Sequence, residues 1–167
     1  ANYLKKKRIS YIKIREPGGS ANSEKIRKLI LSNTSNFNNN TDLLLYMAAR
    51  SENIKEIKKS FKKKIILIDR FTDSTIAYQH YGMRVNINLI NILNKYLLEN
   101  VKVNFTFLNT VSSRNLNDRL KKRKSLNRYD KFDLKFYNRV QNGFIKLSNI
   151  KKNRYKLIDS NLDIKIN

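Results

Sequence analysis

Cysteine and tryptophan are absent from this chain of 167 residues, which also has a single proline and four glycines. Without cysteine, the chain can form neither a disulfide framework nor a thiolate metal site. No apolar run approaches the roughly 20 residues that cross a bilayer, and the amino terminus lacks the apolar segment of a signal peptide. We therefore expect a cytoplasmic protein with no membrane partner, folded as a single domain over residues 1–167.

Acidic residues are also few. Lysine and arginine number 36 against 13 aspartates and glutamates, so the formal net charge is +23. An excess of this size is typical of proteins that bind nucleic acid, anionic membranes or small phosphorylated ligands, and the charge alone leaves these classes open. The basic residues are scattered through every segment and form no long tail, which favours solvated surfaces.

Strand patterns alternate with helix patterns along the chain. Apolar runs predict strands at 9–14, 65–68, 103–108 and 155–158. Helical spacing predicts helices between them, with caps expected at Ser23, at Thr41 or Asp42, and at Ser112 or Ser113. This alternation predicts an α/β fold with a parallel sheet flanked by helices on both faces. The inward residues are expected to be Leu89, Ile90, Leu93 and Leu97 in the helix that starts near Asn86, and Phe132, Phe136, Val140, Phe144 and Leu147 in the last helix.

Two of the predicted strands end in an acid beside a guanidinium. Asp69 and Arg70 follow the buried strand at 65–68, and Arg15 and Glu16 follow the first strand, just before a Pro-Gly-Gly turn. The carboxyl ends of parallel strands form the edge where open α/β sheets bind ligands. Two such pairs at one edge are what a phosphate site with a metal nearby requires.

Two helical segments carry residues suited to a nucleotide. Tyr46 and Arg50 are four residues apart on one helix, which places a ring that can stack on a base beside a guanidinium that can bind its phosphate. Thr75, Tyr78 and Gln79 share one face of the segment after Asp69, where they can bond a base and cover a sugar. Each pattern alone also fits an ordinary solvated helix surface.

The basic segment at 119–130 is predicted to be exposed and mobile, as a lid. Its three arginines can close over a triphosphate and supply positive charge to the transferring phosphoryl group. They are Arg119, Arg123 and Arg128.

Three motifs, in their order along the chain, resemble those of bacterial thymidylate kinase. They are Arg-Glu-Pro-Gly-Gly-Ser at 15–20, Leu-Leu-Leu-Tyr-Met-Ala-Ala-Arg at 43–50 and Asp-Arg-Phe-Thr-Asp-Ser-Thr-Ile-Ala-Tyr-Gln at 69–79. The resemblance implies a P-loop nucleoside monophosphate kinase-like three-layer sandwich. It also implies a homodimeric enzyme that converts dTMP and ATP to dTDP and ADP with Mg²⁺, in dTTP synthesis.

The resemblance assigns roles around the base and sugar. Tyr46 is similar to the aromatic residue, usually Phe, that stacks on thymine. Thr75 and Gln79 are similar to the contacts at the base edge. Tyr78 resembles the ring under the deoxyribose, where it would crowd a ribose 2′-hydroxyl.

The resemblance also assigns roles around the phosphates. Arg50 and Arg70 are similar to the pair that grips the dTMP phosphate, and Asp69 to the acid near the magnesium ion. Arg15 and Glu16 belong to the substrate-binding loop, with the acid near the sugar and phosphate. Arg119, Arg123 and Arg128 fall in the family's lid, whose arginines approach the ATP phosphates.

One departure from the family pattern concerns the ATP phosphates. The family opens with a strand and a Gly-rich loop ending in Gly-Lys-Ser or Gly-Lys-Thr, but none of the glycines at 18, 19, 82 and 143 precedes such a pair. Residues 1–7 resemble the end of the family's first helix, so we expect that loop upstream of Ala1. Without its backbone amides, lysine and hydroxyl, we expect residues 1–167 alone to be inactive in phosphoryl transfer.

Two other classes of protein stay open at this point. One is a non-catalytic protein that binds a nucleotide monophosphate and has lost its ATP site. The other is a basic nucleic-acid-binding protein, whose affinity would fall steeply with salt. The aromatic residues fall on core stripes or in one pocket and form no exposed stacking row, which counts against a specific nucleic-acid partner.

Overall fold

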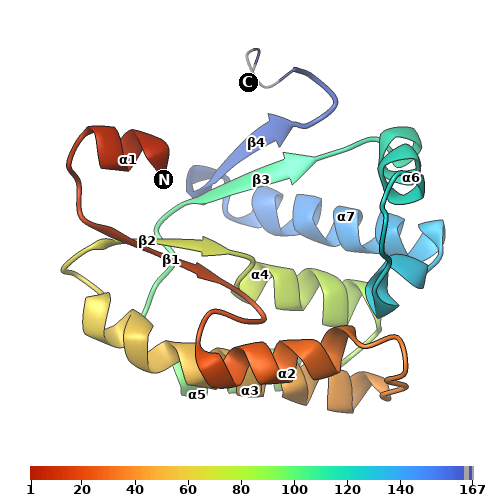
Figure 1. Ribbon diagram of the computed structural model, residues 1–167, viewed down its shortest axis with the longest axis horizontal. Helices are drawn as coiled ribbons and strands as arrows, with labels where there is room; N and C mark the ends of the chain where they lie inside the picture. Colours follow the sequence, from red (N-terminus) through yellow and green to blue (C-terminus); the bar gives the residue numbers. More distant parts are fainter. Residues whose placement is uncertain (164–165, 167) are drawn as a thin grey trace.

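The computed structural model describes residues 1–163 and 166, and its elements alternate between strands and helices (Figure 1). The strands are β1 (Tyr11–Arg15), β2 (Ile65–Asp69), β3 (Thr106–Thr110) and β4 (Tyr155–Asp159). The α-helices are α1 (Asn2–Lys6), α2 (Ala21–Leu31), α3 (Asn39–Ser60), α4 (Thr72–Thr75), α5 (Ile87–Leu98), α6 (Ser113–Lys121) and α7 (Leu134–Ile150). A π-helix, η1 (Ile76–Gly82), and two 3₁₀ helices, η2 (Arg128–Lys131) and η3 (Lys152–Arg154), complete the fold.

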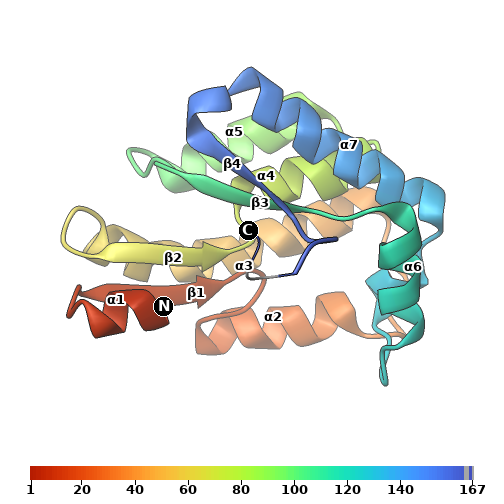
Figure 2. The same cartoon turned by 90° about the horizontal axis from the view of Figure 1, so that it is seen from above.

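The strands form two parallel pairs. β1 pairs with β2 from Tyr11 opposite Ile65 to Arg15 opposite Asp69, and β3 pairs with β4 from Thr106 opposite Tyr155. All four strands run in one direction, side by side (Figure 2). Within residues 1–163 and 166, no backbone ladder joins β2 to β3, so the predicted sheet is present as two separate pairs. The predicted α/β class is confirmed.

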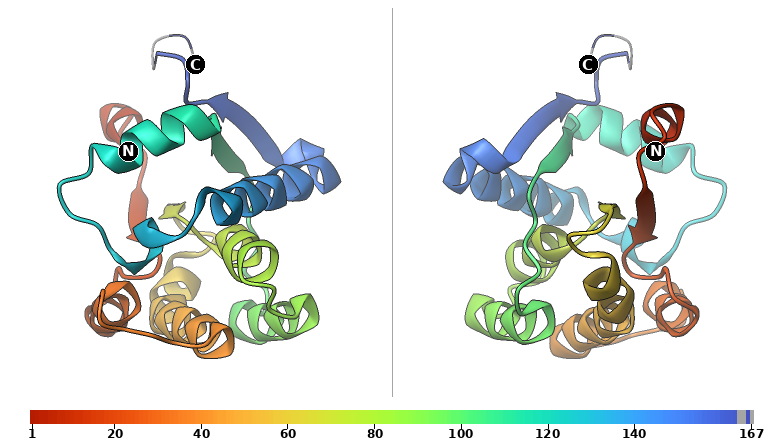
Figure 3. Two further views of the ribbon diagram at one scale, coloured as in Figure 1. Left: turned by 90° about the vertical axis from the view of Figure 1, so that its right-hand side faces the viewer. Right: turned by 90° about the vertical axis from the view of Figure 1, so that its left-hand side faces the viewer.

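The core lies between the strands and the helices that pack on them. Figure 3 shows α2, α3 and α5 side by side below the strands, with α7 beside η1. The predicted stripe on α7 is confirmed at Phe136 and Val140, which are buried. The backbones of α7 and η1 approach closely, because a Cβ at Gly143 would lie 2.5 Å from Cδ2 of Tyr81.

The inward face of α5 differs from the prediction. Ile90 is fully buried, but Leu89 is 37% exposed, and the polar Asn94 takes an inward position. The apolar pattern could not reveal this, because Asn94 is buried by a partner on another element.

Two predicted helix caps are wrong. Ser20 caps α2 in place of Ser23, and Asn38 caps α3 in place of Thr41 or Asp42. Ser23 instead bonds the backbone of Gly18, and Asp42 points into the core. The predicted cap of α6 at Ser112 is confirmed.

The predicted lid consists of the end of α6, a connecting segment at 122–127 and the start of η2. In Figure 3 this segment arcs outward between α6 and η2, and Asn33 Nδ2 donates to the backbone oxygen of Leu126 at 2.8 Å. Arg119 and Arg123 are exposed, as predicted. The predicted exposure of Arg128 is wrong: its side chain is only 14% exposed, because it pairs with the buried Asp42.

None of the helices in the described part of the chain is both long and apolar enough to cross a membrane.

Candidate functional site

The two predicted acid-guanidinium pairs lie next to each other. Arg15 is opposite Asp69 in the parallel ladder, and the backbone N–H of Glu16 donates to the oxygen of Asp69 at 2.9 Å. The carboxyl ends of β1 and β2 therefore form one edge, which is the position expected for a ligand of an α/β protein.

The turn after β1 is held against α2 and α3. Gly18 and Gly19 have φ values of 120° and 105°, a region that glycine occupies without strain. Asn53 of α3 donates from Nδ2 to the Gly18 oxygen at 2.7 Å and accepts from the Ser20 N–H at 3.1 Å. This clamp fixes the direction in which Glu16 leaves the strand.

Arg50 is the most strongly engaged side chain of the site. It is 1% exposed, and its Nε donates to Glu16 Oε2 at 2.9 Å. Its two terminal nitrogens donate to Asn94 Oδ1 at 2.6 Å and to Thr75 Oγ1 at 2.9 Å. The guanidinium also lies 5.0 Å from the ring centroid of Phe71. Arg50 thus ties β1, α4 and α5 to α3.

Glu16 shares that burial, with 4% of its surface exposed. Burial raises the pKa of its carboxyl, while the Arg50 charge and hydrogen bonds oppose the rise. Its Oε1 has no hydrogen-bond partner within the described residues, so one acceptor remains for a ligand.

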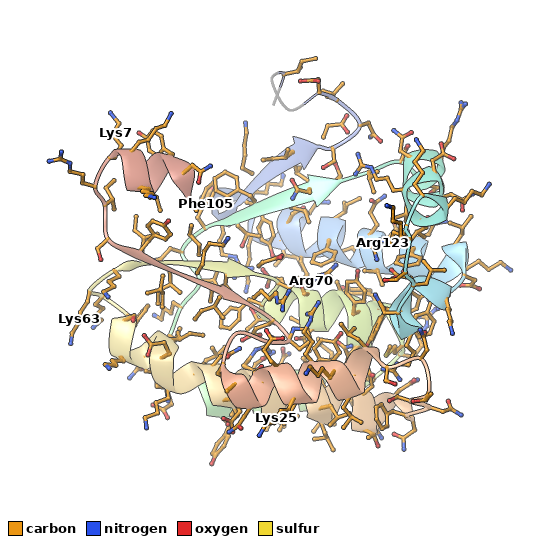
Figure 4. All side chains as sticks on the ribbon, viewed as in Figure 1. Lys7, Lys25, Lys63, Arg70, Phe105 and Arg123 are labelled. Carbon is orange, nitrogen blue, oxygen red and sulfur yellow. The ribbon has the colours of Figure 1, made fainter. Side chains whose placement is uncertain are left out.

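Arg70 differs from Arg50 because it is exposed. Its backbone has a φ of 64°, and its guanidinium lies 5.0 Å from the ring centroid of Tyr78. Figure 4 shows Arg70 in the middle of the molecule, at the end of β2. An exposed guanidinium beside an aromatic ring is available to a phosphate.

Tyr46 and Tyr78, the two predicted tyrosines, both pack against a third tyrosine, Tyr129. The ring centroids of Tyr46 and Tyr78 each lie 6.0 Å from that of Tyr129, in edge-on arrangements. Burial raises the pKa of Tyr46 to about 12, and burial, then Tyr46 and Asp42, also raise the pKa of Tyr129. Both hydroxyls therefore stay protonated at neutral pH.

Thr75 and Gln79 are buried beneath these rings. Gln79 is fully buried, and its Nε2 donates to Asp42 Oδ2 at 3.2 Å and to the Tyr129 hydroxyl at 3.3 Å. Tyr78 and Gln79 stand on the π-helix η1, a feature that is frequent at functional sites.

The remaining predicted site residues do not converge on this pocket. Arg15 is exposed and pairs with Glu24 at 3.0 Å. Arg119 donates to the Ser160 oxygen at 2.5 Å, and Arg123 pairs with Asp130. In Figure 4, Arg123 lies on the lid segment, apart from Arg70.

The sequence did not single out several residues that hold the pocket together. Asn94, Asn53, Asp42 and Tyr129 are all buried and hydrogen-bonded. Asn94 lies four residues after the buried Ile90, but its partner Arg50 is on another helix and the apolar pattern does not indicate it. Tyr129 and Asp42 carry no local signal either, since their contact spans 87 residues.

Metal-binding groups are sparse. Across residues 1–163 and 166, no cluster of three or more His, Cys, Asp or Glu side chains could hold an ion. Asp69 is exposed at the end of β2. A single carboxylate is compatible with Mg²⁺, which binds through one or two carboxylates together with water and substrate phosphates.

The site thus combines an exposed arginine, a buried acid with one unsatisfied acceptor and two tyrosines near the carboxyl edge of parallel strands. Together with the α/β fold, this arrangement defines a protein that binds a nucleoside phosphate.

Comparison with known proteins identifies the family. The thymidylate kinase family model matches residues 1–167. The thymidylate kinase of Thermosipho africanus is 34% identical over 166 residues, covering 98% of this chain and 82% of that protein. That of Vesicomyosocius okutanii is 38% identical over 167 residues, with the same coverage of 98% and 82%. The crystal structure of thymidylate kinase from Ehrlichia chaffeensis matches with a TM-score of 0.72 at 30% identity, covering 93% of this chain and 72% of that one.

The chain belongs to the thymidylate kinase family. The predicted P-loop nucleoside monophosphate kinase-like fold is confirmed, as is the prediction of a dTMP-phosphorylating enzyme family. The comparisons do not favour the two non-catalytic alternatives.

The buried ion pair gives a first testable prediction. Arg50→Met leaves Glu16 buried without its charge partner, and we expect a loss of about 3–5 kcal/mol in the free energy of unfolding. Adding Glu16→Gln should restore part of that loss. Lys58→Met serves as a control, because it breaks an exposed pair with Glu99 and should cost roughly 1 kcal/mol or less. Urea denaturation measures all three values.

We also expect the stability of these variants to depend on pH. A carboxyl whose pKa is raised in the folded state binds protons more readily there than in the unfolded state, so stability falls as pH rises through that range. Arg50→Met should therefore gain stability as the pH is lowered from neutral, and the double variant should lack this gain. Equal stabilities of the single and double variants at neutral pH would contradict the ion pair.

Proposed function

We propose that the residues gathered at the carboxyl ends of β1 and β2, on α3 and on η1 form the site that binds dTMP as the phosphoryl acceptor. The adjacency of the two strand ends carries this proposal, because it brings Glu16, Asp69 and Arg70 to one edge. The tyrosines at 46 and 78, which share the neighbour Tyr129, stand beside that edge.

Each side of the nucleotide has a proposed partner. Tyr46 stacks on thymine, and Tyr78 covers the deoxyribose, where a ribose 2′-hydroxyl would be crowded. Thr75 and Gln79 stand at the base edge and support it through the buried bonds of their side chains. The free guanidinium of Arg70 binds the phosphate, in keeping with its exposure.

Arg50 and Glu16 are proposed to act together on the phosphate and the sugar. Arg50 already donates to three side chains, and these bonds hold the acid in place. Its proposed part in binding the phosphate is the attraction of its positive charge. The unpaired Oε1 of Glu16 then accepts a hydrogen bond from a hydroxyl of the sugar. Arg15 supports the turn through Glu24 and adds positive charge at the edge.

ATP is the proposed phosphoryl donor, with Mg²⁺ held by Asp69 together with phosphate oxygens. The ion would neutralise charge on the phosphates. We propose that Arg119 and Arg123 of the lid segment approach ATP, and their exposure supports this. Because both substrates are intracellular nucleotides, we propose that the chain acts in the cytoplasm.

A Gly-rich phosphate-binding loop is also required by this proposal, and residues 1–167 contain none. We propose that it stands at the end of a further strand, one that pairs with the open edges of β2 and β3. In support, these two strands have no ladder between them in the described part of the chain.

A homodimer is the proposed assembly. The outer faces of α3 and α5, which pack together, carry a patch of exposed apolar side chains. The members of this α3–α5 patch are Leu44, Leu89, Ile92 and Tyr96. Exposed apolar side chains on two helices that pack together are typical of a protein interface.

Phosphate recognition is tested by comparing dTMP with thymidine. Arg70→Gln should weaken dTMP binding about 10- to 100-fold, as expected for a lost hydrogen bond to a charged group, and should weaken thymidine binding much less. Arg84→Gln is the control, since this exposed arginine lies outside the pocket. Calorimetric titration gives both affinities, and equal losses for the two ligands would disprove the phosphate role.

Catalysis is tested by extending the chain. A chain to which a strand and a Gly-rich loop ending in Gly-Lys-Thr are added before residue 1 should form dTDP from dTMP, ATP and Mg²⁺. Residues 1–167 alone should bind dTMP without forming dTDP, because the loop supplies the phosphate contacts. Chromatography of the nucleotides measures both results. No dTDP from the longer chain would refute the kinase proposal, and dTDP from residues 1–167 would refute the need for the loop.

Assembly is tested by placing a charge in the α3–α5 patch. Ile92→Glu should convert the dimer to a monomer in sedimentation analysis, because a charge would be buried at the interface. Ile150→Glu is the matched control at an exposed position on α7. A mass that is unchanged by Ile92→Glu would exclude this interface.

A further inference from the structure

A buried cluster joins the lid segment to the pocket. We define the Asp42 cluster as Asp42, Gln79, Arg128 and Tyr129. Asp42 is 1% exposed, and its Oδ1 accepts from the Arg128 guanidinium. Its Oδ2 accepts from the Tyr129 hydroxyl and from Gln79 Nε2. One carboxylate therefore binds α3, η1 and η2 together.

The cluster fixes Arg128 in the protein interior. Its guanidinium lies 5.3 Å from the ring centroid of Phe37 and 5.2 Å from that of Tyr129. Because Asp42 also neutralises its charge, Arg128 is not free to reach across to a phosphate. Its surroundings indicate a positioning residue, unlike the exposed Arg119 and Arg123.

The start of η2 is itself rigidly built. Asn127 and Asp130 form a reciprocal cap, in which the Tyr129 N–H donates to Asn127 Oδ1 at 2.8 Å and the Asn127 N–H donates to Asp130 Oδ2 at 3.0 Å. Arg123 of the lid segment pairs with the same Asp130. Any displacement of η2 is therefore passed on to the segment before it.

Tyr129 connects this rigid turn to the pocket. Its ring touches both Tyr46 and Tyr78, the two rings proposed to hold the base and sugar. Its backbone oxygen accepts from the Tyr137 hydroxyl at 2.8 Å, which ties it to α7 as well. A ligand that orders the two tyrosines must also favour the docked position of η2.

We propose that the Asp42 cluster couples occupation of the dTMP site to the position of the lid segment at 119–130. Asp42, Arg128 and Tyr129 act as positioning residues through Tyr46, Tyr78 and Gln79. By linkage, docking of η2 strengthens dTMP binding by the same factor with which dTMP favours docking. This inference rests on the proposed dTMP site.

Hydrogen-deuterium exchange of the 167-residue chain tests the coupling. In the unchanged chain, dTMP should slow exchange across residues 119–131. In Asp42→Asn and Arg128→Gln, dTMP should still bind, with an affinity about tenfold lower, and should no longer slow exchange there. Tyr129→Phe, which keeps the ring and loses only the hydroxyl, provides a milder variant if either of the others fails to fold.

A second carboxylate in the chain supplies a matched control. Asp73 accepts from the Arg154 guanidinium and from the Tyr155 hydroxyl at 2.6 Å. This carboxylate therefore has the same two kinds of donor as Asp42, but it lies at the start of β4, away from the lid segment. Asp73→Asn should lower stability yet keep the effect of dTMP on residues 119–131. Loss of that effect in the control as well would overturn the coupling, because any destabilisation would then suffice.

A cycle of two variants separates coupling from simple loss of contacts. Asp42→Asn combined with Arg128→Gln should weaken dTMP no further than either change alone, because both remove one linkage. Additive losses would overturn the proposal. If dTMP binds every variant equally and still slows exchange in the lid segment, the coupling is refuted and the proposed dTMP site stands. If dTMP does not bind the unchanged chain, both the proposed dTMP site and the coupling are refuted.

Discussion

The buried contact between Arg50 and Glu16 is the constraint on which the pocket depends. Both groups are almost fully removed from water, and a buried charge is tolerated only when it is paired and hydrogen-bonded. The pair therefore requires the turn after β1, the middle of α3, Thr75 of α4 and Asn94 of α5 to hold one relative position. A shift of any of these elements would expose an uncompensated charge to an apolar surrounding.

A second set of buried charges organises the opposite wall. Asp42 and Asp73 each receive an arginine and a tyrosine hydroxyl, and in both cases the donors are consecutive residues. One carboxylate fixes η2 against α3, and the other fixes β4 against α4. Asp42 also accepts from Gln79 of η1, which helps to explain how a short π-helix can present a defined surface.

Much of this fold could be predicted from sequence, because strand order and helical spacing are local patterns. The acids and arginines at 15–16 and 69–70 were also predictable, since the carboxyl ends of parallel strands meet at one edge. The burial of Arg128 and the role of Asp42 were not, because their contact spans 86 residues and leaves no periodic signal. The position of Leu89 was predicted wrongly for a related reason: the buried Asn94 is stabilised by Arg50, a partner outside its own helix.

The close approach of α7 to η1 has a consequence for the whole molecule. With no ladder between the β1–β2 and β3–β4 pairs in the described residues, side-chain packing between helices must hold the two halves in register. At Gly143 and Gly82 that packing leaves no room for even one methyl group. A single added carbon there would act as a wedge and would push α7 away from η1.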